Sequence, residues 1–143
     1  MSGDAVSDHI LDTNILIRYL RKMQGYKDLL RETNRKGWVY ISAMTRLEIV
    51  RGMLEPERED TFDLLDSLET IHITGEIADL AGELIRSWRS QGVILSDTDA
   101  LIAASALQSG LTLVTTNPRH FPMPELTVLQ ADESGNLTPY KVA

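Results

Sequence analysis

Three carboxylic residues interrupt apolar parts of the sequence and are the first candidates for chemistry. Asp12 follows the apolar run at residues 9–11, Glu48 lies in a helical pattern between apolar neighbours, and Asp99 precedes a stripe of small apolar residues. A carboxylate in such a setting is unfavourable unless a cation or hydrogen-bond donors meet it, or unless it takes up a proton. The chain has no cysteine, so oxygen atoms are its natural metal ligands. Asp12, Glu48 and Asp99 are therefore candidate ligands of a cation.

Two of these acids have alternative structural explanations. Asp12 stands immediately before an apolar helical pattern and could serve only as the cap of that helix. Glu48 borders the apolar stripe of its helix and could form an ordinary ion pair with Arg51 or Arg46. The sequence leaves both explanations open.

Asp99 and a polar cluster further along are ambiguous in the same way. Ser96 and Asp99 have the spacing of a capping box, and Asp97 could cap the same helix from the solvent side. Residues 115–117 place two threonines and Asn117 after an apolar strand pattern, but Asn117 also precedes a proline, as in a plain turn. Only a common location would distinguish a site from four separate structural roles.

Hydrophobic spacing predicts strands and helices that alternate along the chain. Strands are expected at residues 9–11, 38–41, 70–73, 111–115 and 126–130. Helices are expected at residues 14–23, 27–35, 44–54, 56–68, 76–90 and 96–109. This alternation indicates a mainly parallel sheet covered by helices on both faces, and such sheets bind ligands at the carboxyl ends of their strands.

Length and composition favour one domain, residues 1–143, with a polar C-terminal tail at 131–143 that has no predicted regular structure. The chain has 143 residues and is 43% hydrophobic, enough for one buried core. Residues 1–9 lack the basic start and apolar run of a secretory signal. No segment approaches the roughly 20 apolar residues of a membrane span. We expect a cytoplasmic protein with no membrane contact.

The formal net charge of -7 counts against a protein that binds nucleic acid over a broad surface, because such binding needs Lys and Arg to neutralise phosphates. The charge is uneven. Residues 1–54 hold nine Lys/Arg and six Asp/Glu, a net +3, whereas residues 55–143 hold five and fifteen, a net -10. Basic residues of the first part, among them Arg18, Arg46 and Arg51, could bind a nucleic acid substrate locally or could be ordinary solvated side chains.

Taken together and in order, these motifs resemble the PIN-domain family, in particular the VapC-type toxin ribonucleases of toxin-antitoxin pairs. The matching stretches span almost the whole chain. They are Leu11-Asp12-Thr13-Asn14, Leu47-Glu48-Ile49 with Gly52, Asp99-Ala100-Leu101-Ile102-Ala103-Ala104, and Val114-Thr115-Thr116-Asn117 followed by His120-Phe121. The resemblance implies a PIN-like three-layer α/β/α fold with a mainly parallel central sheet.

The resemblance also implies a Mg²⁺-dependent endoribonuclease, with Mn²⁺ as an alternative metal. Asp12, Glu48 and Asp99 take the positions of the family's acids as catalytic residues and metal ligands. Asn117 stands where many members have a fourth acid, which places a full second metal site in doubt. Thr13, Asn14, Asp97, Thr116 and Asn117 are expected to support the site. His9, His72 and His120 share no ligand spacing and are expected to be surface or packing residues.

The implied substrate is RNA, often transfer or ribosomal RNA, cut to leave a 5′-phosphate. The implied partners are a small antitoxin, with a helix bound in a groove, and a second copy of the chain in a homodimer. Two other roles remain open: a non-catalytic PIN-like binding module, for which the missing fourth acid argues, and a PIN nuclease of RNA processing or repair.

Overall fold

The computed structural model describes residues 7–141. Their sheet has six strands in the order β3-β2-β1-β4-β5-β6. The strands are β1 (His9–Leu11), β2 (Val39–Ser42), β3 (Glu69–Ile71), β4 (Thr112–Thr115), β5 (Val128–Ala131) and β6 (Leu137–Tyr140). All neighbours pair in parallel except β5 and β6, which are antiparallel. The three-layer, mainly parallel fold predicted from the sequence is confirmed.

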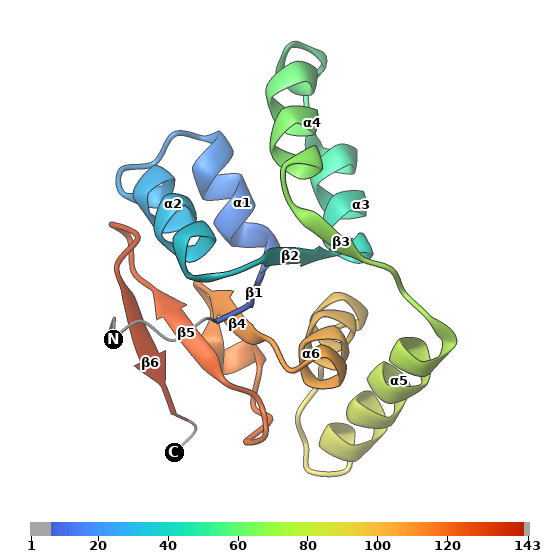
Figure 1. The fold of residues 1–143 in the computed structure, drawn as a ribbon. Helices are drawn as coiled ribbons and strands as arrows, with labels where there is room; N and C mark the ends of the chain where they lie inside the picture. Colours follow the sequence, from blue (N-terminus) through green and yellow to red (C-terminus); the bar gives the residue numbers. More distant parts are fainter. Residues whose placement is uncertain (1–6, 142–143) are drawn as a thin grey trace.

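Helices cover the two faces of this sheet (Figure 1). The α-helices are α1 (Thr13–Leu20), α2 (Tyr26–Lys36), α3 (Ala43–Gly52), α4 (Arg58–Asp66), α5 (Gly75–Arg89) and α6 (Asp97–Ser109). Two short 3₁₀ turns complete the described elements, η1 (Glu55–Glu57) and η2 (Pro118–His120). Figure 1 shows α1 and α2 on one side of the sheet and α5 and α6 on the other, with α3 and α4 beside its β3 end.

Parallel register determines which side chains of the two central strands share a face. Ile10 pairs with Leu113 and Leu11 pairs with Val114. Ile10 and Leu113 belong to the apolar cluster beneath α6, whereas Leu11 and Val114 belong to the cluster beneath α1 and α2. Strands buried on both faces read as continuous apolar runs, which explains the unbroken hydrophobicity of residues 10–11 and 113–114.

The strand order reverses between β1 and β4. From β1 the chain moves outward through β2 and β3, and it then returns to place β4 on the other side of β1. Open α/β sheets bind ligands in the crevice at such a switch point, beyond the carboxyl ends of the strands. The residues that follow β1 and β4 therefore occupy the position in the fold best suited to a site.

The C-terminal segment differs from the sequence prediction. No strand was expected after residue 130, yet β6 pairs with β5 through residues 137–140. The turn between them packs on the turn between α1 and α2, where Tyr26 donates a hydrogen bond of 2.7 Å to the backbone oxygen of Asp132. Gly25 and Gly135 lie so close that a Cβ atom on Gly25 would overlap the carbonyl of Ser134. Only this tertiary contact gives the polar segment its structure, so local pattern did not reveal it.

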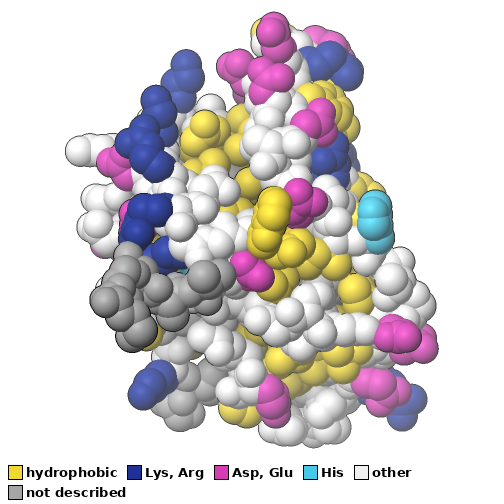
Figure 2. All heavy atoms as spheres, in the orientation of Figure 1, with side chains coloured by type: hydrophobic (Ala, Val, Ile, Leu, Met, Phe, Trp, Pro, Cys, Tyr) yellow, Lys and Arg dark blue, Asp and Glu magenta, His cyan; other side chains and the backbone are white. Residues whose placement is uncertain are grey.

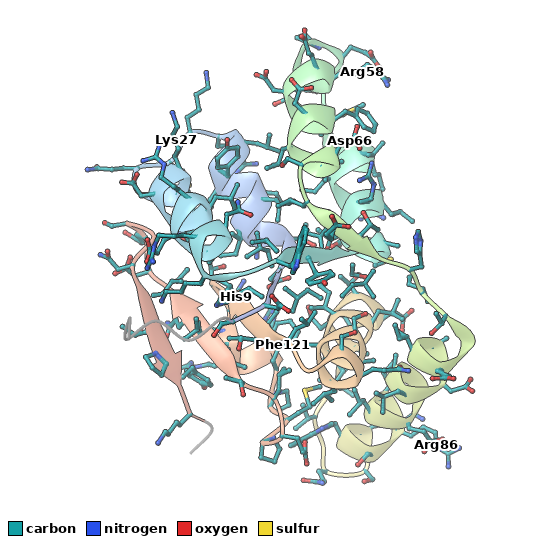
Figure 3. The ribbon with its side chains drawn as sticks, in the orientation of Figure 1. His9, Lys27, Arg58, Asp66, Arg86 and Phe121 are labelled. Atoms are coloured by element: carbon teal, nitrogen blue, oxygen red, sulfur yellow. The ribbon has the colours of Figure 1, made fainter. Side chains whose placement is uncertain are left out.

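Other differences are small. The helix predicted at 14–23 ends at Leu20, and the helix predicted at 56–68 is the turn η1 followed by α4. Figure 3 shows the side chains of His9 and Phe121 inside the molecule and that of Lys27 extending from α2 to the outside. Within residues 7–141, no helix combines the length and the apolar character that crossing a membrane requires.

Candidate active site

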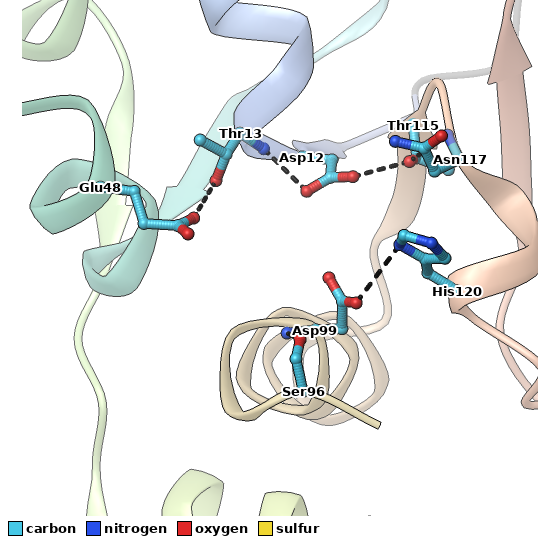
Figure 4. A network of polar contacts seen from close by, with 8 residues as sticks. All are labelled: Asp12, Thr13, Glu48, Ser96, Asp99, Thr115, Asn117 and His120. Carbon is cyan, nitrogen blue, oxygen red and sulfur yellow. Dashed lines mark hydrogen bonds and ion pairs between the residues drawn. The ribbon is translucent and has the colours of Figure 1, made fainter. Parts of the chain in front are cut away.

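The candidate site is formed by carboxylates from three separate elements at the β1–β4 switch point. Asp12 ends β1 and precedes α1, Glu48 lies on α3, and Asp99 lies in the first turn of α6. Figure 4 shows the three carboxylates turned toward one shared space, with Asp12 between Glu48 and the residues that follow β4. The tertiary structure thus brings together three acids that the sequence separates by 36 and 51 positions, as their numbers 12, 48 and 99 show.

Asp12 is the most constrained of the three acids. Its side chain is 6% exposed. One carboxylate oxygen accepts a hydrogen bond of 2.8 Å from the backbone N–H of Thr13, and the other accepts one of 2.7 Å from the hydroxyl of Thr115. The predicted helix cap is therefore present, but it uses only one oxygen. The second oxygen is held across the sheet, because the β1–β4 register aligns the residue after Leu11 with the residue after Val114.

Burial raises the pKa of the Asp12 carboxyl above its ordinary value. The hydrogen bonds from Thr115 and Thr13 oppose this rise, because they favour the charged form. The neighbouring carboxylates of Asp99 and Glu48 raise the pKa further by like-charge repulsion. Asp12 thus responds to the other two acids across the shared space, as members of one cluster do.

Glu48 is held by the residue next to Asp12. The Thr13 hydroxyl donates a hydrogen bond of 2.7 Å to Glu48 Oε1, while Arg51 Nη2 lies 3.9 Å from Glu48 Oε2. The Arg51 side chain is 69% exposed, so this ion pair is weak. Arg46 points elsewhere: it donates to the backbone oxygen of Leu65 and pairs with Asp66, tying α3 to α4.

Asp99 has partners on its own helix and across the site. Ser96 caps α6 by accepting a hydrogen bond of 3.1 Å from the Asp99 backbone N–H. Burial raises the pKa of the Asp99 carboxyl, Ser96 and His120 lower it, and Glu48 raises it. The His120 Nδ1 atom lies 3.5 Å from Asp99 Oδ2. Half of the predicted capping box is therefore present, and the carboxylate itself faces the shared space (Figure 4).

Several supporting residues lie at the site without a direct bond to an acid. Asn14 and Thr116 are half-buried beside the loops that carry Asp12 and Thr115, and Asp97 is exposed at the start of α6. Asn117 donates its backbone N–H to the Thr115 hydroxyl at 3.0 Å and begins η2. Arg18 donates to the Tyr26 hydroxyl and stacks on the Tyr26 ring, so its guanidinium is directed toward the α1–α2 turn.

The structure adds two contacts to the sequence prediction. The sequence places Thr115, Thr116 and Asn117 together after the strand and proposes only Thr116 and Asn117 as supporting residues, whereas the fully buried Thr115 is the one that contacts Asp12 directly. His120 was expected to be an ordinary surface residue, yet it lies against Asp99. The register of β4 against β1 would have identified Thr115, but nothing in the local sequence indicates where the η2 turn directs His120.

The donor set fits a divalent cation that keeps part of its water shell. All three acids supply hard oxygen ligands, which Mg²⁺ and Mn²⁺ prefer, and their mutual repulsion would be relieved by positive charge. Among residues 7–141, however, no three Asp, Glu or His side chains lie close enough to ligate one ion directly. An ion in this space would therefore be bound partly through water, as is usual for Mg²⁺.

Comparison with known proteins identifies the family. The PIN domain family model matches residues 9–124, so this chain belongs to the PIN domain family. Ribonuclease VapC10 and Ribonuclease VapC19 of Mycobacterium tuberculosis are each 34% identical to it. Each alignment covers 80% of this chain, and 86% and 92% of the relatives respectively. PIN-domain nucleases of the VapC kind depend in general on a divalent metal.

Solved structures agree with this family. The structure of VapBC2 from Rickettsia felis bound to a DNA fragment from their promoter aligns with a TM-score of 0.75 and 25% identity, over 87% of this chain and 99% of that chain. A toxin-antitoxin complex from Klebsiella pneumoniae aligns with a TM-score of 0.68 and 27% identity, over 82% and 94%.

Proposed function

We propose that this chain is a Mg²⁺-dependent endoribonuclease and the toxin of a toxin-antitoxin pair. The observation that carries the proposal is the convergence of Asp12, Glu48 and Asp99 on one space at the switch point of the sheet, with Asp12 buried and its pKa raised. Structural stability alone gives no reason to gather three acids, because like charges repel, and the pKa of Asp12 is raised by Asp99 and Glu48. Relatives named ribonucleases support the same assignment.

Asp12 and Asp99 are the proposed principal metal ligands, and Glu48 is a further ligand or the base. A divalent cation bound by these residues would make a bound water more acidic and would neutralise charge on the phosphate oxygens. Thr13 and Thr115 keep the Glu48 and Asp12 carboxylates in place, so little reorganisation is needed during the reaction.

The reaction is a hydrolysis of the RNA backbone. Glu48 Oε2 accepts a proton from the attacking water, whose oxygen forms the new bond to phosphorus. The bond from phosphorus to O3′ breaks, O3′ takes a proton from solvent, and the products carry a 5′-phosphate and a 3′-hydroxyl. Asn117 and Thr13 lie beside these groups in Figure 4, and they are the residues that we propose to orient water or substrate.

Among the three arginines proposed for substrate binding, Arg51 is the best placed. Its exposed guanidinium lies beside Glu48, at the rim of the site. The Arg18 and Arg46 guanidiniums are instead bonded within the fold, to Tyr26 and to the α4 end. Arg51 is therefore the arginine that we expect to contact a phosphate of the RNA.

An antitoxin partner has a groove available to it. A groove of about 930 Å³ lies between the α1–α2 turn and α4, and it shares Leu20 with a smaller hollow of about 190 Å³ that includes Glu48. Lys22, Lys27 and Arg31 line the larger groove together with Asp60 and Asp63. Figure 2 shows basic side chains over the α1–α2 side, and acidic side chains together with some basic ones toward the top of α4. A partner helix in this groove would lead toward the acids.

The proposal includes action in the cytoplasm as a homodimer, as the resemblance implies. The decisive experiment incubates the purified full chain with total cellular RNA and Mg²⁺ and maps new 5′ ends. The wild-type chain is expected to cut RNA, and EDTA, Asp12→Asn and Asp99→Asn are expected to reduce cutting to background. Asp79→Asn, which changes an exposed acid of α5, is the matched control and should retain activity.

Retained cleavage by Asp12→Asn or Asp99→Asn would refute the assigned site. A wild-type chain that binds no metal and cuts no RNA would instead support the non-catalytic binding module. A short neighbouring gene for a DNA-binding antitoxin would favour the toxin over a nuclease of RNA processing or repair.

A further inference from the structure

Each acid of the candidate site is contacted by one polar side chain from another element. Thr115 of β4 donates to Asp12, and Thr13 of α1 donates to Glu48. His120 of η2 occupies the corresponding position beside Asp99 on α6, with Nδ1 at 3.5 Å from Oδ2. In Figure 4 the imidazole lies on one side of the Asp99 carboxylate, and the other oxygen of that carboxylate is directed toward Asp12.

We propose that His120 is a positioning residue, which holds the Asp99 carboxylate in the orientation that faces Asp12 and thereby sets the affinity of the site for a divalent cation. This inference rests on the proposed function of the acidic site. The inference adds His120 to the residues of the acidic site, although the sequence predicts an ordinary surface or packing histidine. The turn η2, which carries His120, thereby becomes part of the site.

The backbone of η2 is fixed well enough for this task. Pro118 and Phe121 are buried on either side of the exposed pair Arg119–His120, and Phe121 is 0% exposed in the cluster beneath α6. The His120 N–H donates to the Asn117 oxygen, and the Phe121 N–H donates to the Pro118 oxygen, both at 3.0 Å. The turn is thus anchored at both ends, and His120 is directed at the start of α6 rather than left free in solvent.

The same short segment serves two acids. Thr115 accepts the backbone N–H of Asn117 while donating to Asp12, and Asn117 in turn accepts the backbone N–H of His120. Residues 115–120 therefore couple the position of Asp12, at the end of β1, to the position of Asp99, on α6. A fixed spacing between these two carboxylates is what a shared cation requires, because partners outside the ligand set orient the ligands and tune the metal.

The His120 Nδ1 atom lies 3.5 Å from Asp99 Oδ2, a separation within ion-pair range but longer than that of an ordinary hydrogen bond. Both the neutral tautomer that carries hydrogen on Nδ1 and the imidazolium donate from this atom. His120 differs from Thr115 and Thr13 in exposure: its side chain is 61% exposed, whereas Thr115 is 0% and Thr13 is 8% exposed. Substitution at position 120 therefore tests the orientation of Asp99 without opening a cavity in the core.

Three substitutions separate the role of Nδ1 from that of the ring. His120→Asn places an amide nitrogen near the Nδ1 position, His120→Gln places its amide near Nε2, and His120→Ala removes both. His72→Ala changes another exposed histidine, outside the site, and is the control. Affinity for Mn²⁺ alone is measured by calorimetric titration of each full chain without RNA. The Mn²⁺ concentration for half-maximal RNA cleavage and the thermal midpoint are measured alongside.

We expect His120→Ala and His120→Gln to weaken Mn²⁺ binding by about 10-fold to 100-fold, the usual loss when a partner of a metal ligand is removed. The Mn²⁺ requirement of cleavage should rise by the same factor at an unchanged thermal midpoint. His120→Asn should restore binding to near the wild-type value, and His72→Ala should match the wild type. A merely structural histidine would not give this rescue.

The inference and the proposed function fail in different ways. Wild-type Mn²⁺ affinity in His120→Ala, or an equal loss in His120→Asn and His120→Ala, overturns the positioning role while leaving the nuclease intact. Absence of RNA cleavage by the wild-type chain overturns the proposed function, and the titrations with Mn²⁺ still decide the role of His120. A wild-type chain that does not bind Mn²⁺ overturns the positioning role as well.

Discussion

The two ends of β1 each bury one titratable side chain, but their surroundings differ. At the amino end, His9 is 3% exposed and its Nδ1 atom has no hydrogen-bond partner among the described residues. At the carboxyl end, Asp12 is 6% exposed and both of its oxygens accept hydrogen bonds. His9 lies in the closed interior (Figure 3), whereas Asp12 faces the space shared with Glu48 and Asp99 (Figure 4).

His9 is a buried group without a stabilised charge, whereas Asp12 is a buried group whose charged form is held by hydrogen bonds. Burial lowers the pKa of His9, so this side chain is held neutral and bears no charge for a ligand. Burial is the largest cause that raises the pKa of Asp12, the neighbouring acids add to the rise, and two hydrogen-bond donors oppose it by stabilising the charged form. A cation at the carboxyl end would offset both the burial and the repulsion of this carboxylate.

The largest expected difference between the two ends is their response to metal. We expect Mn²⁺ at 100 times its dissociation constant to raise the free energy of unfolding of the wild-type chain by about 2.7 kcal/mol relative to EDTA. His9→Gln should keep this increment, and Asp12→Asn should lose most of it. Urea unfolding with and without Mn²⁺ measures all three. Equal increments in the two variants would contradict the assignment of the metal to the Asp12 end.

A smaller effect concerns the cost of the acidic cluster when metal is removed. Because the folded-state pKa of Asp12 lies above its ordinary value of 3.8, ionised Asp12 lowers stability at neutral pH, and this cost disappears as the pH falls toward 3.8. Asp12→Asn should therefore have a free energy of unfolding about 0.5–2 kcal/mol higher than that of the wild-type chain at pH 7.5 in EDTA. Its urea midpoint should rise accordingly.

The control for this measurement is Asp79→Asn, which changes an exposed acid and should alter stability by less than about 0.5 kcal/mol. A destabilised Asp12→Asn variant would mean that its two hydrogen bonds outweigh burial and repulsion. In that case, only Asp99→Asn would be expected to raise the free energy of unfolding in EDTA.

The smallest expected effect is a change in the pH dependence of the unfolding free energy caused by His9. Because the folded-state pKa of His9 lies below its ordinary value of 6.5, the unfolded chain binds the proton first, and stability falls as the pH drops below about 6.5. One such group contributes at most about 1.4 kcal/mol per pH unit. His9→Gln should flatten the pH dependence of the unfolding free energy between pH 6.5 and 5.5. An unchanged slope would show that other groups dominate this range.

Much of the fold followed from local pattern. The apolar runs at 9–11 and 111–115, the helical spacing of 76–90 and the glycine after Ser109 located β1, β4, α5 and α6 to within a few residues. These elements bury continuous or periodic apolar faces, and the types of residues close together in the sequence are enough to predict that burial. The strand predicted at 126–130 corresponds to β5, but the sequence does not predict β6, because this polar strand is held by pairing with β5 and by backbone contact at Gly25, not by its own composition.

The sequence by itself determined the identities of the three acids, the apolar strands that precede two polar turns, and the absence of thiolate ligands. Only the tertiary structure decided which side chains meet each acid. It placed Thr115 on Asp12 and Thr13 on Glu48, turned Arg46 away toward Asp66, and brought His120 to Asp99. The physical reason is that side-chain partners across a sheet depend on register and strand order, which short-range patterns do not encode.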